Sequence, residues 1–228
     1  MKILILAIPL IFGIPLSTQA SIVTFDELST FITTTTATAT APLANTGLLA
    51  GSASNSQTVG NLTFSITAPS FGLFFGTFGT SIAPDPWTTR LNGNQIAISD
   101  VSNLNVDLSN PVFSFGFEFV EPEFDPNVNQ IFVDSSFEVS LLDNGVIVDS
   151  FTFNAINDAA AFVGVWGDTS FNRVEIREIV GGPENEFFGQ FYTGTSPVPV
   201  PAAVWLFATA LIGLLGIGRS RSSASSFS

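Results

Sequence analysis

Five oxygen-bearing side chains occupy alternate positions along one short acidic segment. They are Glu121, Glu123, Asp125, Asn127 and Asn129. In an extended chain, residues two apart point to the same side, and Ca²⁺ prefers carboxylate and amide oxygens. The segment is therefore a candidate Ca²⁺ site, although Pro122 and Pro126 fit a solvated loop equally well. It is no EF-hand, because Pro126 replaces the required glycine and Phe132 replaces the bidentate glutamate.

Acidic residues near both ends of the central region form a second candidate set for Ca²⁺. Asp26 and Glu27 lie near its start, and Glu184 and Glu186 lie near its end. A cation that ties the first strand of a sandwich to the last would use side chains at such positions. The alternative interpretation is a solvated acidic surface that keeps the protein soluble.

Aromatic and paired acidic residues are candidates for sugar chemistry. Trp87, in the segment APDPWTT next to Arg90, is either a platform for stacking on a sugar ring or an ordinary loop anchor. Trp166, within FVGVW, is either a second stacking platform or a core residue, and the core is the favoured prediction. Two carboxylates suffice for glycoside hydrolysis, but the 19 acidic residues offer many pairs and the sequence singles out none.

Composition excludes several kinds of catalysis and several partners. The chain has no His and no Cys, so a Ser-His-Asp triad, a Cys-His pair, a zinc site and haem ligation by His or Cys are all excluded. All 19 acidic residues lie between Asp26 and Glu186, where the basic residues are Arg90, Arg173 and Arg177; three minus 19 gives a formal charge of −16. Such a surface repels nucleic acid and anionic lipid.

The N-terminal segment 1–20 has the layout of a cleaved signal peptide. Lys2 is followed by an apolar run that Pro9 and Pro15 interrupt, and then by the small residues of Ser17-Thr18-Gln19-Ala20. A signal peptidase is expected to cut between Ala20 and Ser21.

The C-terminal segment predicts a single transmembrane helix. Residues 202–218 are apolar and uncharged, and a helix of that length reaches about 25 Å, the short limit of a bilayer core. Arg219 and Arg221 follow at once, which places the tail of the chain in the cytoplasm. Three alternating prolines precede the helix and predict an extended strip.

This C-terminal stretch, VPVPAAVWLFATALIGLLGIGRSR, resembles the PEP-CTERM sorting domain in its Val-Pro-Leu-Pro-Ala variant. Val200 departs from the main form, which has Glu, and the basic cluster is thin. The resemblance assigns the recognition motif and the basic cluster to Pro197, Val198, Pro199, Val200, Pro201, Ala202, Arg219 and Arg221. It implies a Gram-negative host, transient insertion in the inner membrane, recognition by an exosortase, and delivery to the outer envelope surface or to an extracellular matrix rich in exopolysaccharide.

Alternating apolar residues predict an all-β ectodomain over residues 21–196. Val112–Phe119 places four phenylalanines on one face of a strand, and Asn144-Gly145 predicts a hairpin turn. Further strands are expected at 61–67, 73–82, 95–99, 104–108, 128–133, 137–141, 146–153, 161–166, 171–177 and 187–192. These strands predict an antiparallel sandwich or jelly roll. Within the Thr/Gly/Ser-rich part 29–60, expected to be partly flexible, residues 29–41 are either an edge strand or an exposed mobile stretch, and 45–60 are a loop.

Parts of the ectodomain are similar to β-sandwiches that recur in PEP-CTERM proteins, which look distantly like carbohydrate-binding jelly rolls. The predicted domain order is signal peptide (1–20), ectodomain (21–196), sorting signal (197–221) and Ser-rich tail (222–228). The predicted function is that of a non-enzymatic exported protein of the cell surface or matrix, either structural or glycan-associated. The alternative is a carbohydrate-active enzyme with two catalytic carboxylates on the same sandwich.

Overall fold

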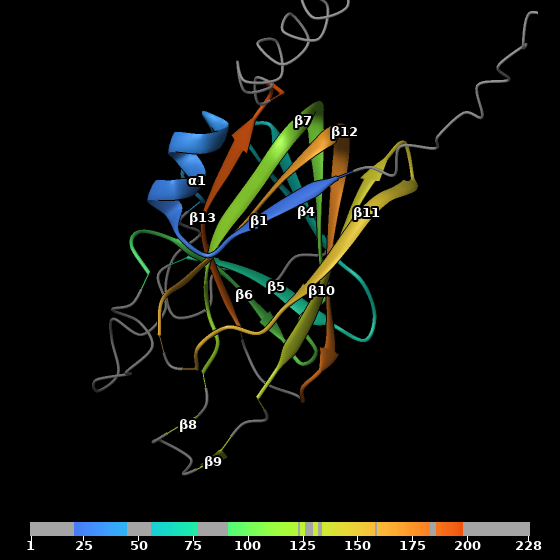
Figure 1. Ribbon diagram of the computed structural model, residues 1–228. Coiled ribbons are helices and arrows are strands. Elements are labelled where there is room, and N and C mark those ends of the chain that lie inside the picture. Colours follow the sequence, from blue (N-terminus) through green and yellow to red (C-terminus); the bar gives the residue numbers. More distant parts are fainter. Residues whose placement is uncertain are drawn as a thin grey trace, which may run out of the picture.

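The computed structural model describes residues 21–44, 56–76, 91–122, 124–125, 130–131, 134–157, 159–182 and 186–197. These residues are mostly antiparallel strand (Figure 1). In order, the elements are β1 (Ile22–Phe25), α1 (Leu28–Thr35), β2 (Thr38–Ala39), β3 (Ser56–Val59), β4 (Leu62–Ile66), β5 (Phe71–Gly76), β6 (Gln95–Ser99), β7 (Leu104–Val120), β8 (Phe124–Asp125), β9 (Gln130–Ile131), β10 (Ser136–Asp143), β11 (Val146–Phe153), β12 (Ala161–Val180) and β13 (Phe187–Gly194).

Two long strands organise the sheet. The strand order is β11-β10-β12-β7-β13-β6-β5, with β1 added to β12, β2 to β13, and the β3–β4 hairpin to β7. The register between β12 and β7 shifts on either side of Phe171, and such irregularities bend a strand and increase its twist. One part of β7 therefore pairs with β13 while its first part pairs with β4, which gives the sandwich-like arrangement in Figure 1.

Phenylalanine dominates the main core. Phe115, Phe117 and Phe119 alternate along β7 and are at most 1% exposed. Phe119 contacts Phe137 with ring centroids 5.2 Å apart, and Phe137 stacks on Phe153 at 5.0 Å. Burying a side chain of this size contributes about 1.5–3 kcal/mol, so packing of this kind can stabilise a sandwich that has no disulfide.

The opposite face of β7 is also covered, which the sequence did not predict. Ser114 and Gly116 are both buried on that face, and Phe31 of α1 and Phe162 of β12 lie over Gly116. Gly116 is the register partner of Gly164. A Cβ at Gly164 would lie 2.7 Å from Phe162 and 2.9 Å from Phe31, so the two glycines form the hollow that accepts these rings.

Residues 28–35 form a helix, so both interpretations of the Thr-rich segment were wrong there. Thr33 and Thr35 donate side-chain hydrogen bonds to the carbonyls of Ser29 and Phe31, each at 2.7 Å. Threonine is a weak helix former, but burial of Phe31, which is 0% exposed, fixes the turn against the sheet. Figure 1 shows α1 on the outside, beside β13 and β7.

Most predicted strands are confirmed, with two kinds of correction. The hairpin turns at Asn144 and Gly145, which have φ of 49° and 82°. The pairs predicted at 104–108 and 112–119, and at 161–166 and 171–177, are each one continuous strand, because bulges interrupt the pairing and not the strand. Residues 56–59 form β3 where a loop was expected. Among the described residues, the structure has no helix with the length and hydropathy to cross a membrane, and 202–218 lie outside them.

Candidate functional site

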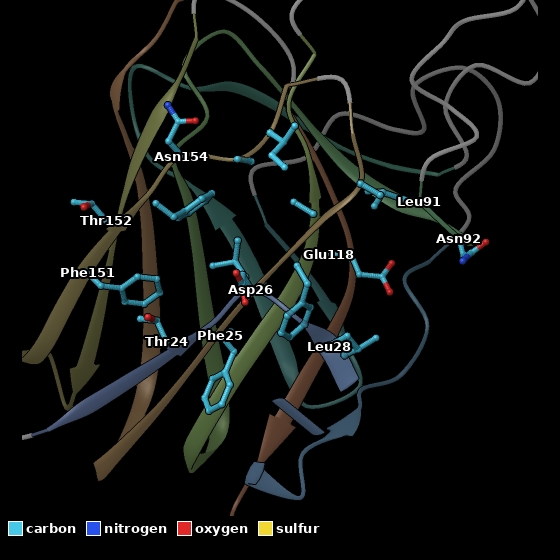
Figure 2. A pocket seen from close by; sticks show the side chains of 18 residues that line it. Thr24, Phe25, Asp26, Leu28, Leu91, Asn92, Glu118, Phe151, Thr152 and Asn154 are labelled. Carbon is cyan, nitrogen blue, oxygen red and sulfur yellow. The ribbon is translucent and has the colours of Figure 1, made fainter. Parts of the chain in front are cut away.

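A groove of about 780 Å³ lies between β1, the start of α1, the β11–β12 connection and the outer face of β7. Figure 2 shows Asp26 near its centre, with Glu118 on one side and Phe151 on the other. Its polar lining includes two carboxylates, Asp26 and Glu118, and two amides, Asn92 and Asn154. Apolar walls complete the groove, so it offers hydrogen-bonding groups and flat hydrophobic surface together.

Glu118 is held in place by β13. The Tyr192 hydroxyl donates a hydrogen bond to Glu118 Oε1 at 3.1 Å. Gly189 leaves the space that the carboxylate needs, since a Cβ there would lie 3.1 Å from Glu118 Cβ and 3.2 Å from Oε2. Tyr192 is the only hydrogen-bond partner of this side chain among the residues that the structure describes.

The Tyr192 hydroxyl remains a hydrogen-bond donor to Glu118 because its pKa is raised. Burial, followed by the charge and the hydrogen bond of Glu118, raises the pKa of Tyr192 to about 12. The phenol therefore stays protonated through the neutral range and fixes the orientation of the carboxylate that accepts its proton.

Asp26 reaches the groove because the end of β1 is anchored. Thr24 and Phe25 pair with Val165 and Gly164 of β12. The Phe25 ring meets Phe31 at 5.4 Å, which ties the strand to α1. Asp26 is exposed and has no hydrogen bond or ion pair within the described parts of the chain.

Positive charge lies elsewhere in the described structure. Arg173 Nη1 contacts Asp107 Oδ1 at 2.9 Å, and its Nε contacts Glu175 Oε1 at 2.8 Å. Arg177 Nη2 contacts Glu175 Oε2, also at 2.8 Å. Neither arginine is among the residues that line the groove, so the two groove carboxylates face it without a described cation.

The predicted Ca²⁺ sets are brought together only in part. Glu121, from the first set, and Glu186, from the second, are both 0% exposed and both bind Ser135. The Ser135 backbone N–H donates to Glu121 Oε1, and its hydroxyl donates to Glu186 Oε1 at 3.5 Å. The Ser102 hydroxyl donates to Glu186 Oε2. We call these four residues the Ser135 junction.

Glu178, which the sequence did not single out, lies next to this junction and accepts a hydrogen bond from the Ser102 N–H at 2.6 Å. The side chains of the other members of the first set, and Glu184, lie outside the described residues. Asp26 lines the groove instead, and Glu27 accepts from the Thr30 hydroxyl at 3.4 Å. Over the parts of the chain with described placement, no three His, Cys, Asp or Glu side chains are grouped so that they could hold a metal.

The remaining predicted sites are the two processing signals at the chain ends and the two tryptophans. The backbone carbonyl of Ser21 accepts a hydrogen bond from the Asp168 N–H at 3.1 Å. Pro197 follows the end of β13. Ala20, Trp87, residues 198–202, Arg219 and Arg221 lie outside the described residues. Trp166 is half-buried on the outer face of β12 and not in the core, because the inward positions of that strand belong to Val163 and Val165.

The groove itself was missed because it joins distant segments. Asp26, Glu118 and Asn154 come from three separate parts of the sequence. The sequence signals that were available are weak ones: Glu118 is the only acid within the predicted strand Val112–Phe119, and Asp26 directly follows an apolar strand.

Comparison with known proteins gives few relationships. The sequence matches no protein family and has no significant match among curated proteins. One similar solved structure is a mutant of a family 29 carbohydrate-binding module, with 11% identity and a TM-score of 0.32 over 72% of this chain and 98% of that one. Another is the C-terminal family 22 carbohydrate-binding module of Clostridium thermocellum Xyn10B, with 9% identity and a TM-score of 0.34 over 69% and 99%. Because these values are low, the proposals below rest on the groove and not on these likenesses.

Proposed function

We propose that this chain is an exported surface or matrix protein, without catalytic activity, that holds a glycan in the groove of Asp26 and Glu118. The observation that carries the proposal is a solvent-open groove in which two carboxylates and two amides lie beside apolar walls. Sugars present hydroxyl groups around the ring and C–H groups on its faces, so a site of mixed polar and apolar lining is complementary to them.

Delivery to the surface is the second part of the proposal. Signal peptidase removes residues 1–20, and an exosortase acts at Pro197–Ala202 while 202–218 sit in the inner membrane. The position of the sandwich supports this order: β1 begins at Ile22 and β13 ends at Gly194, so the ectodomain fills the interval between the two predicted signals.

Glycan binding is tested with the processed protein purified from the host envelope or medium. We expect retention on the exopolysaccharide of the host in affinity electrophoresis, and loss of retention in an Asp26→Asn, Glu118→Gln variant. The control for each of the two substitutions made singly is Asp149→Asn on β11, which removes one half-buried charge outside the groove and keeps the acceptor for the Ser150 N–H. No retention of the unaltered protein on any polysaccharide of the host overturns the binding proposal.

Sorting is tested by replacing Pro199 and Pro201 with Ala. The change leaves the hydrophobicity of the segment nearly unaltered but lets the helix extend into the strip that a transpeptidase must bind. We expect a full-length form to accumulate in the inner membrane, while a control with Ser222 and Ser223 replaced by Ala is processed normally. N-terminal sequencing of the processed protein should begin at Ser21. Equal surface delivery of the proline variant would leave 202–218 as a simple anchor.

A glycoside hydrolase is the second candidate, and one observation favours it: two carboxylates line the same groove. Retaining enzymes hold such a pair about 5–5.5 Å apart and inverting enzymes about 6.5–9.5 Å apart. Under the binding proposal, incubation with the polysaccharide of the host releases no reducing ends. Release that is abolished separately by Asp26→Asn and by Glu118→Gln would replace the binding protein with an enzyme.

A further inference from the structure

The charges that face the groove define its ligand more narrowly than a glycan in general. Asp26 and Glu118 are both carboxylates, and no Lys or Arg is among the described residues that line the groove. Glu118 has a single described donor, Tyr192, which bonds to Oε1. Both carboxylates therefore have oxygen atoms that can accept hydrogen bonds from a ligand in the groove.

A protonated amine satisfies such carboxylates better than a hydroxyl group. Hydrogen bonds in which both partners are charged are shorter and roughly twice as strong as neutral ones. Glu118 is half-buried against β13, where screening by water is weaker, so a cationic partner gains more there than on an open surface. A uronate or sulfate group would instead meet two like charges.

The negative electrostatic field of the whole ectodomain also favours a cationic ligand. Residues 21–196 contain 19 acidic residues and three arginines, and the two described arginines are paired with Asp107 and Glu175. A strongly negative surface concentrates polycations near the protein and repels polyanions.

The groove also has surface for the apolar faces of sugar rings. Leu28, Phe151 and Phe162 are among its lining residues, and Figure 2 shows the Phe151 ring across the groove from Glu118. C–H faces of a pyranose pack on such surfaces, so a ligand of this groove combines a sugar ring with positive charge.

We infer that the groove binds a glycan with free, protonated amino groups, that is, a hexosamine polymer that is not fully N-acetylated. The inference rests on the proposed function and deepens it by naming the class of sugar. Asp26 and Glu118 receive the ammonium groups, Tyr192 orients Glu118, and the apolar walls receive the ring faces.

The experiment compares four oligosaccharides of equal length by calorimetry with the processed protein at pH 6, where an ordinary amine is protonated. The probes are tetramers of glucosamine, N-acetylglucosamine, glucose and mannuronate. We expect the glucosamine tetramer to bind at least about tenfold more tightly than the acetylated and neutral tetramers, and the mannuronate tetramer not to bind. Raised salt should weaken the glucosamine complex most.

Variants separate the groove from the general negative field. Asp26→Asn and Glu118→Gln should each weaken binding of the glucosamine tetramer by about tenfold, whereas Asp149→Asn, with the same change in net charge, should alter it less than about twofold. Thermal melts of each variant check that the fold persists.

The outcomes distinguish this inference from the proposal on which it rests. Equal binding of glucose and glucosamine tetramers, or an effect of Asp149→Asn as large as that of the groove variants, overturns the amine class and leaves glycan binding intact. Failure of all four tetramers together with failure to bind the polysaccharide of the host overturns both.

Discussion

The groove and the Ser135 junction both contain two carboxylates, but they hold them differently. At the junction, Glu121 and Glu186 are 0% exposed and accept hydrogen bonds from the backbone and hydroxyl groups of Ser135 and from Ser102. In the groove, Asp26 is exposed and Glu118 is half-buried with one described donor.

The difference lies in where the hydrogen-bond donors come from. A buried carboxylate is tolerated in a fold when the protein supplies donors, and its removal leaves those donors without an acceptor. A carboxylate at the wall of an open groove leaves acceptor capacity for a ligand. The acidic residues of the junction therefore bind donors within the protein, whereas those of the groove are the ones that we propose bind a ligand.

Removing a junction carboxylate should have the largest effect. Glu186→Ala leaves the Ser102 and Ser135 hydroxyls without this acceptor in a buried place. Each such loss costs about 1–3 kcal/mol, so we expect a total loss of about 3 kcal/mol in the free energy of unfolding, measured by chemical denaturation. Asp26→Ala, in the groove, is the matched control and should change it by less than about 0.5 kcal/mol. Equal losses in the two variants would contradict the different roles assigned to the junction and groove carboxylates.

Chelation tests whether a cation takes part near the junction. If the segment 121–129 binds Ca²⁺, a free Ca²⁺ concentration of about 100 times the dissociation constant stabilises the fold by roughly 2.7 kcal/mol. On this prediction EDTA lowers the melting temperature, and a variant with Glu123 and Asp125 replaced by Ala does not respond. An unchanged melt retires the Ca²⁺ site.

A substitution in the glycine hollow under α1 should cause the next largest loss of stability. Gly164→Ala places a Cβ 2.7 Å from Phe162 and 2.9 Å from Phe31, and overpacking of this kind costs about 1–3 kcal/mol. The same substitution in a Phe31→Leu background should cost less, because the smaller side chain leaves room. Additive losses in this double-mutant cycle would contradict the packing account.

The smallest effect is spectroscopic. The chain has one tyrosine, so absorbance at 295 nm reports the titration of Tyr192 alone, with an expected midpoint near pH 12. Because the folded-state pKa lies above the ordinary value of 10, the stability that this residue contributes is complete below pH 10 and is lost as the pH rises toward 12. Circular dichroism checks that the sheet persists over the range used.

Glu118→Gln should move that midpoint down toward 10, since the charge of Glu118 is removed, with little loss of stability because the amide oxygen still accepts from Tyr192. An unchanged midpoint would mean that burial alone raises the pKa of Tyr192, and that Glu118 and Tyr192 are not coupled.

The sequence alone determined the antiparallel β architecture and many of its strands. Alternation along Val112–Phe119 predicts a strand because the side-chain period of two matches the pleat, and Asn144-Gly145 predicts a hairpin because the turn needs positive φ. The length, charge and proline pattern of the two ends led to the prediction of export and sorting. These are local properties, which are encoded in neighbouring residues.

Tertiary structure decided what local patterns do not contain. Residues 28–35 become a helix because Phe31 fills the hollow over Gly116 and Gly164, which are distant in the sequence. The contact of Phe31 with Phe25 ties β1 to α1, and Asp26 lines the groove together with Glu118. The fold also joins Glu121 and Glu186 through Ser135. Burial and hydrogen-bond partners depend on which strands meet, so the roles of these carboxylates became visible only in the folded chain.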